Sequence, residues 1–201
     1  NRALRLMEVD LIIKMGFFIR DLHNHIATLH LQQYSGRSHK ESFMVYRGQG
    51  LSLKDFNDLQ KAQGGLLSFN NFLSTSFDQE VSFAFAESNQ CDPNLIGILF
   101  QITIDPSISS SIFANVRDFG HFEEEEEILF SMHSIFRIEL VKKIDGYDRL
   151  WQVNLTLVHE NNSQLHVLTE QLRKETFPEK KGWYRLGILL IKLGQFDKAE
   201  Q

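Results

Sequence analysis

Apolar residues recur every three or four positions over residues 3–33, with charged and polar residues between them. This spacing is typical of an amphipathic helix, because positions three and four apart lie on one helical face. The pattern predicts a long helix with a break near Gly16. Residues 34–40 are polar and predict a connection to the next element.

Short apolar runs rich in aromatic and β-branched residues predict strands in most of the chain that follows. The predicted strands cover residues 42–46, 66–77 with a turn in the middle, 95–104, 112–116, 125–130, 136–142 and 150–158. The first strand is followed by Arg47-Gly48-Gln49-Gly50, which predicts a turn.

Two short helices interrupt these strands. Ser52 stands three residues before Asp55 and can cap one helix, and Asp78 can cap another that extends to about residue 87. Strands outnumber helices, and the late strands follow one another closely. The predicted fold class is therefore α+β with a mostly antiparallel sheet.

The composition narrows the classes of function. The 201 residues include 21 Lys and Arg against 26 Asp and Glu, a net charge of −5. This charge argues against broad binding to nucleic acids or anionic membranes. No apolar run approaches the roughly 20 residues of a membrane-spanning helix. The sequence begins at Asn1 with neither a signal-peptide pattern nor an initiator Met, so we expect a piece of a longer protein. The single Cys91 excludes internal disulfides and favours a reducing, cytoplasmic compartment.

Five consecutive glutamates occupy positions 123–127. A bare run of this kind is ordinarily a solvated charge stretch. Here Ile128 follows without a loop, so the last glutamates must enter a buried strand. Side chains two apart on a strand share a face, which places Glu125 and Glu127 together and Glu126 on the other side. Paired carboxylates are suited to stabilising a cationic transition state and to moving a proton.

Two other segments carry candidate chemistry. Arg47 follows an apolar strand and precedes glycines, an arrangement in which a guanidinium can clamp a phosphate while backbone amides approach the ligand. Ser74 and Ser76 alternate and therefore face one way. Each segment alone is weak evidence for a functional site, because most arginines at strand ends are solvated and alternating hydroxyls indicate only an edge strand.

Taken together, Arg47-Gly48, Ser74-Thr75-Ser76 and Glu125-x-Glu127 resemble the R-S-E pattern of the mono-ADP-ribosyltransferases, and the glutamate pair resembles that of the arginine-specific branch. The resemblance covers about residues 42–158 in the family's order. It implies N-terminal helices and a mostly antiparallel, split β-sheet around an NAD cleft. It also implies transfer of ADP-ribose from NAD, as co-substrate, to an arginine of a target protein, with release of nicotinamide and without a metal.

The resemblance assigns a role to each matching residue. Arg47 would hold the NAD phosphates and Gly48 the nicotinamide amide. Ser74 would orient Glu127, which would bind the nicotinamide ribose and stabilise the cation formed as nicotinamide leaves. Glu125 would engage the acceptor guanidinium and help to remove its proton. The other candidates for NAD binding are Gln49, Thr75, Ser76 and Phe85.

Several residues have a structural interpretation instead. His23 and His25 lie on different faces of the predicted first helix, so we expect no metal site there with His30. As a set, phenylalanines are more often core than ligand contacts. We therefore expect a core role for Phe83, Phe85, Phe100, Phe113 and Phe136. Among them Phe85 is singled out, because family members place an aromatic side chain near the nicotinamide.

The C-terminal segment has a pattern of its own. It matches the start of a tetratricopeptide repeat at Trp183, Leu186, Gly187, Leu190, Gly194, Phe196 and Ala199. An ordinary amphipathic helix is the alternative. The expected organisation is a catalytic domain over residues 1–162 with a helical part at 1–40, a linker at 163–181 and a truncated repeat at 182–201. Repeat arrays bind protein partners on a concave face.

Two alternative functions remain open. The same site with water as acceptor would make the protein an NAD glycohydrolase. A transferase fold kept for protein interaction would be catalytically inert. The second alternative would require lost motif residues, and Arg47, Ser74 and Glu127 are all present.

Overall fold

The computed structural model describes residues 8–34, 41–106, 111–117, 127–132, 134–158, 165, 167 and 170. The chain divides into two compact units, Asn1–His159 and Glu160–Gln201. The predicted repeat at 182–201 lies outside the described residues, as do Glu125 and all but three residues of the predicted linker. Across the described part of the chain, no helix has the length and apolar character needed to cross a membrane.

The predicted first helix is two helices in the structure. Helix α2 (Val9–Lys14) and helix α3 (Gly16–Tyr34) meet at Met15, close to the predicted break. Ile26 and Leu29 of α3 are buried and cluster with Phe72 and Ala114. The apolar spacing of the sequence thus marks the face that packs on the rest of the unit.

Eight strands form one sheet in the order β2-β7-β8-β4-β1-β3-β6-β5. Their bounds are β1 (Phe43–Ser52), β2 (Leu66–Ser68), β3 (Leu73–Ser76), β4 (Leu95–Ile104), β5 (Phe113–Asn115), β6 (Glu127–Phe130), β7 (Ile135–Lys143) and β8 (Leu150–Leu157). Only β4 and β8 pair in parallel within this sheet; the other neighbours are antiparallel. The predicted α+β class with a mostly antiparallel sheet is confirmed.

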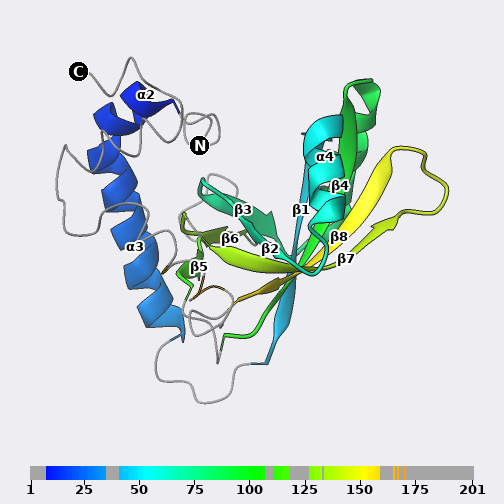
Figure 1. Ribbon diagram of the computed structural model, residues 1–201. Helices are drawn as coiled ribbons and strands as arrows, with labels where there is room; N and C mark the ends of the chain where they lie inside the picture. The colour runs from blue at the N-terminus through cyan, green and yellow to red at the C-terminus, as the bar shows by residue number, and fades with distance from the viewer. Residues whose placement is uncertain are drawn as a thin grey trace. The chain divides into compact units, whose positions relative to one another are not determined.

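The sheet nearly divides between β1 and β3. Every residue of β1 pairs with β4, whereas β1 and β3 share the single pair Tyr46 and Ser76. In Figure 1, β3, β6 and β5 spread away from the long strands β1, β4, β8 and β7. The sheet therefore has a larger and a smaller part, joined at one pair of residues.

The short helices begin where the sequence predicts. Helix α4 (Leu53–Lys61) is capped by Ser52, whose hydroxyl accepts from the backbone N–H of Asp55 at 3.1 Å. Helix α5 (Gln79–Ser88) is capped by Asp78, whose carboxylate accepts from two backbone N–H groups of the first turn. A 3-10 turn, η1 (Asn89–Cys91), follows α5. These caps are local interactions, which explains why the sequence alone located them.

The predicted turn at 47–50 is wrong. Strand β1 continues through Gly48 and Gly50, and both pair with β4. These glycines serve close packing instead: a Cβ on Gly48 would lie 2.6 Å from the backbone nitrogen of Ala86, and one on Gly50 2.5 Å from the side chain of Asn89. Helix α5 can lie against β1 because these positions lack side chains.

The prediction for residues 66–77 also needs correction. The segment forms β2 and β3, which do not pair with each other. Strand β2 pairs with β7 at one edge of the sheet, and β3 pairs with β1 and β6 in the smaller part. The local pattern finds both strands, but long-range pairing decides where each one lies.

Most of the phenylalanines form the core as expected. Phe100, Phe113 and Phe136 are buried, with Phe130 beside them. Phe83 is half-buried and packs edge-on against Tyr147 at a centroid distance of 5.6 Å. The core prediction is wrong for Phe85, which is 63% exposed, because α5 turns its small residues toward the sheet.

Helix α3 covers the edge strand β5 with side-chain hydrogen bonds. The amide of Gln33 donates to the carbonyl of Asn115 at 2.8 Å and accepts from its N–H at 2.9 Å, as a neighbouring strand would. The Nδ1 atom of His30 lies 2.7 Å from the carbonyl oxygen of Phe113, and that of His23 lies 2.6 Å from the hydroxyl of Ser131. These bonds give His23 and His30 structural partners, and those to β5 protect a sheet edge.

Candidate functional site

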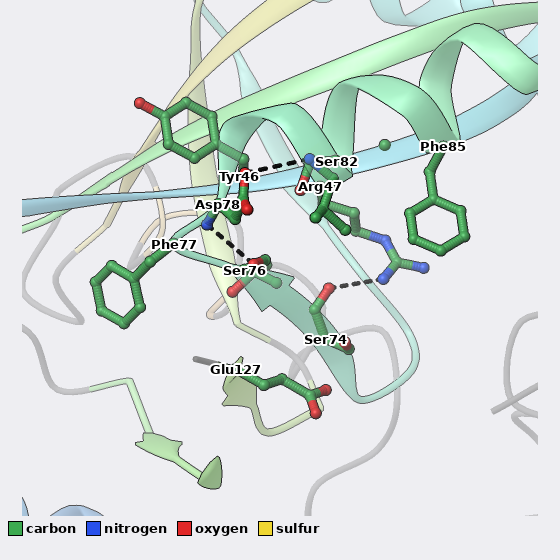
Figure 2. A pocket seen from close by; sticks show the side chains of 12 residues that line it. Tyr46, Arg47, Ser74, Ser76, Phe77, Asp78, Ser82, Phe85 and Glu127 are labelled. Atoms are coloured by element: carbon green, nitrogen blue, oxygen red, sulfur yellow. Dashed lines mark hydrogen bonds between the residues drawn. The ribbon is translucent and has the colours of Figure 1, made fainter. Parts of the chain in front are cut away.

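A cavity of about 760 Å³ lies where the sheet divides. It is lined by residues of β1, β3, the connection from β3 to α5, α5 and the first residue of β6 (Figure 2). The lining residues are Tyr46, Arg47, Gly48, Ser74, Thr75, Ser76, Phe77, Asp78, Val81, Ser82, Phe85 and Glu127. Its volume is within the range of small-molecule sites.

The cavity follows from the divergence of β1 and β3. Beyond the pair Tyr46 and Ser76 the two strands separate, so backbone groups that a complete ladder would use face the gap. Buried or half-buried backbone groups need other partners. The guanidinium of Arg47 supplies one such partner, to the carbonyl of Ser74.

Arg47 bridges this gap. Its Nη1 donates to the backbone carbonyl of Ser74 at 2.6 Å, and its Nε donates to Oε1 of Gln49 at 3.1 Å. In Figure 2 the guanidinium points toward Ser74 and the ring of Phe85. A fixed cation therefore stands at one wall of the cavity, suited to a phosphate or carboxylate ligand.

Strand β3 has a buried and an open face. Leu73 and Thr75 are buried, and the Thr75 hydroxyl donates to the carbonyl of Ile128 at 2.9 Å, which ties β3 to β6. Ser74 and Ser76 lie on the half-exposed face, as their alternation predicts. The Ser76 hydroxyl accepts from the backbone N–H of Asp78 at 3.0 Å and so joins β3 to the start of α5.

Glu127 begins β6 directly opposite Ser76. Opposite residues of an antiparallel pair share a face, so its carboxylate lies on the side of Ser74 and Ser76. Ser74 pairs with Leu129 and is therefore the diagonal neighbour of Glu127. The hydrogen bonds of the described residues do not include one between Ser74 and Glu127. Glu125, the other member of the predicted pair, lies outside the described residues.

Helix α5 forms the wall opposite β3. Its buried residues Ser82 and Ala86 face the glycines of the sheet, while Val81 and Phe85 are 43% and 63% exposed. Phe85 brings an aromatic face to the cavity beside the cation of Arg47. Such a face can stack on a planar ring of a ligand.

Comparisons with known proteins identify this arrangement at the level of fold. No family model matches the sequence, and no curated protein matches it either. Solved structures do match. The Vis toxin of Vibrio splendidus, an ADP-ribosyltransferase, is 22% identical with a TM-score of 0.50 over 75% of this chain and 63% of its own. The enzymatic component C2-I of the Clostridium botulinum C2 toxin is 15% identical with a TM-score of 0.53 over 81% of this chain and 40% of its own.

The chain has an ADP-ribosyltransferase fold. It spans less than two thirds of the length of either of these two proteins. The fold class implied by the R-S-E resemblance is therefore confirmed, whereas the similarity at this level of identity does not extend to substrate or acceptor.

Within this ADP-ribosyltransferase fold, most of the predicted site residues line one cavity. The structure brings together Arg47, Gly48, Ser74, Thr75, Ser76, Phe85 and Glu127. Gln49 is not among the described residues of the lining, and its amide is bonded to Arg47 instead.

Five lining residues were not predicted as site residues: Tyr46, Phe77, Asp78, Val81 and Ser82. A helical-spacing signal could have found three of them. Asp78, Val81, Ser82 and Phe85 stand three, four and seven positions apart and so share one face of α5. Once Phe85 is assigned to the site, this spacing places the others beside it.

Proposed function

We propose that this chain transfers ADP-ribose from NAD to an arginine side chain of a target protein and releases nicotinamide. The main support for this proposal is that Arg47, Ser74 and Glu127 line one cavity in an ADP-ribosyltransferase fold. The Glu125-x-Glu127 spacing of the sequence supports arginine as the acceptor. The target protein would have to present that arginine at the mouth of the cavity.

The chemistry of the lining residues fits NAD. Arg47 offers a fixed cation to the diphosphate, the hydroxyls of Ser74 and Ser76 offer hydrogen bonds to a ribose, and exposed Phe85 offers a stacking face to the nicotinamide ring. Glu127 supplies a carboxylate on the same side as the two serines. The cavity thus contains a group for each part of NAD around the bond that must be broken: the diphosphate, the ribose and the nicotinamide.

The proposed reaction needs a positioned carboxylate. The bond between ribose C1′ and the nicotinamide nitrogen breaks, and its electron pair leaves with nicotinamide, which becomes neutral. Positive charge then develops on the ribose, where a carboxylate at the position of Glu127 stabilises it. A guanidinium nitrogen of the acceptor bonds to C1′ and gives up a proton to the carboxylate assigned to Glu125.

The first test is Glu127→Gln, which keeps the shape of the side chain and removes its charge. Nicotinamide release and labelling of a small guanidino compound should both fall by at least about two orders of magnitude, the lower scale for a positioned catalytic group. Both are measured by chromatography with labelled NAD. Wild-type rates in this variant would refute the role of Glu127.

Two companion variants separate the roles within the acidic run. Glu125→Gln should lose transfer to the guanidino compound and retain NAD hydrolysis. Glu126→Gln is the matched control and should change either rate by less than about twofold. Nicotinamide release by the wild type without labelling would indicate an NAD glycohydrolase, and absence of NAD consumption would leave an interaction module.

The domain organisation is also proposed. We infer a catalytic domain over residues 1–162 and a repeat region from residue 182, joined by a linker. The tetratricopeptide-like spacing that begins at Trp183 supports this division. A repeat array at that place would recruit the target or another protein partner. A fragment of residues 1–162 should retain transfer to a small guanidino compound, because the acceptor in that assay is not recruited.

A further inference from the structure

The side chain of Gln49 lies where it can control the orientation of Arg47. The two residues are two apart on β1, so their side chains are on one face of the strand. The Nε of Arg47 donates to Oε1 of Gln49 at 3.1 Å. A guanidinium carries only donors, so the Gln49 atom that faces it must be the carbonyl oxygen.

A second bond holds the same guanidinium from another strand. The Nη1 of Arg47 donates to the carbonyl oxygen of Ser74 on β3 at 2.6 Å. Two bonds to different nitrogens of a planar group fix its plane as well as its position. Because β3 has already separated from β1 at this point, the guanidinium is held across the gap that forms the cavity.

The surroundings of the Arg47–Gln49 bond are apolar on the side of the core. Arg47 pairs with Phe100 and Gln49 pairs with Ile98 on β4, and both partners are buried. Directly opposite residues in an antiparallel sheet place their side chains on one face. A hydrogen bond beside such groups is electrostatically stronger than one in water. Removing the acceptor at this place therefore costs free energy.

We propose that Gln49 is a positioning residue that orients Arg47 for the diphosphate of NAD without contacting NAD itself. Gln49 is absent from the described lining of the cavity, whereas Arg47 belongs to it. An arginine fixed before its ligand arrives loses less rotamer freedom on binding, which favours binding. The inference rests on the proposed function, because that function makes a diphosphate the ligand of Arg47.

The first measurement is the KM for NAD in the variant Gln49→Met, which keeps the length of the side chain and removes the acceptor. KM should rise about tenfold, the effect of one hydrogen bond to a charged group, while kcat for nicotinamide release changes by less than about twofold. Gln152→Met is the matched control: Gln152 is also a strand glutamine, and its amide is bonded to Gln101 and Asn154. It should leave KM unchanged.

A double-mutant cycle tests whether Gln49 acts through Arg47. Lysine at position 47 keeps the charge but lacks the planar fork of donors. In an Arg47→Lys background, Gln49→Met should therefore alter KM by less than about twofold. An equal tenfold rise in both backgrounds, or an unchanged KM in the single variant Gln49→Met, would overturn the proposal.

A third measurement does not depend on NAD turnover. The Nε–H of Arg47, assigned by its loss in Arg47→Lys, should exchange with water at least about tenfold faster in Gln49→Met than in the wild type. Gln49→Glu keeps an acceptor oxygen and should restore slow exchange. Equal exchange in the wild type and Gln49→Met would refute the positioning role. Absence of NAD consumption by the wild type would refute the proposed function instead, and the exchange rates would still test the bond.

Discussion

Replacing Gly48 by alanine tests the packing that builds one wall of the cavity. Gly48 lies within β1 and beneath α5, and it pairs with Leu99 of β4. A Cβ at this position would lie 2.6 Å from the backbone nitrogen of Ala86 and closer still to the carbonyl oxygen of Ser82. These are backbone atoms of a helix, so no side-chain rotation can relieve the overlap.

The magnitude follows from this geometry. Uncharged heavy atoms prefer separations of about 3.5–4.0 Å, so α5 must move by about 1 Å or more. Overpacking of this kind costs about 1–3 kcal/mol. In a domain of this size each kcal/mol lowers Tm by about 2–4 °C, so we expect a decrease of about 2–12 °C. NAD turnover should fall as well, because Val81 and Phe85 move with the helix.

The assay is thermal and urea unfolding followed by circular dichroism, with two glycine controls. A Cβ on Gly16 meets nothing within 4 Å, so Gly16→Ala should be neutral or stabilising. A Cβ on Gly50 meets chiefly the side chain of Asn89, which can rotate, so Gly50→Ala should lose less stability than Gly48→Ala. A Gly48→Ala variant within about 0.5 kcal/mol of the wild type would refute this account of the packing.

Three further predictions concern individual contacts. Asp78→Ala removes a cap bonded at 2.7 and 3.2 Å to the first turn of α5 and should cost about 1 kcal/mol in urea unfolding, whereas Asp78→Asn should cost much less. Gln33→Leu removes both bonds to Asn115 and should cost about 1–3 kcal/mol, with faster amide exchange at Asn115; unchanged exchange would contradict the edge-covering role. The carboxylate of Glu87 raises the pKa of Tyr147 above 10.0, so Glu87→Gln should lower it in an absorbance titration referenced to Tyr147→Phe.

Local interactions made much of the fold accessible from the sequence. Strand β4 has the predicted bounds of residues 95–104, and the caps Ser52 and Asp78 begin α4 and α5. Each of these features depends on residues close together in the chain. The three segments of the R-S-E resemblance were likewise visible in the sequence, and its fold is the one observed.

Contacts between distant segments decided the remaining features. The sequence Arg47-Gly48-Gln49-Gly50 has the composition of a turn, yet it is strand because β4 pairs with it and α5 packs on its glycines. Phe85 is apolar but exposed because the same close packing buries the small residues of α5 instead. Hydrophobicity alone cannot identify the buried face of a helix when the strand that it packs on has glycines at the contact.

The sequence by itself determined most of the element types, the helix caps and the residue types available for chemistry. Only the tertiary structure decided that Arg47, Ser74 and Glu127 line one cavity, because β1 pairs with β3 and β3 pairs with β6, which brings together residues that lie far apart in the chain. It also gave Gln49 its partner, since the separation of β3 from β1 places the guanidinium of Arg47 between Gln49 and the carbonyl of Ser74. Short-range patterns specify the local elements and the side chains that they carry, whereas long-range strand pairing specifies which of these side chains come into contact.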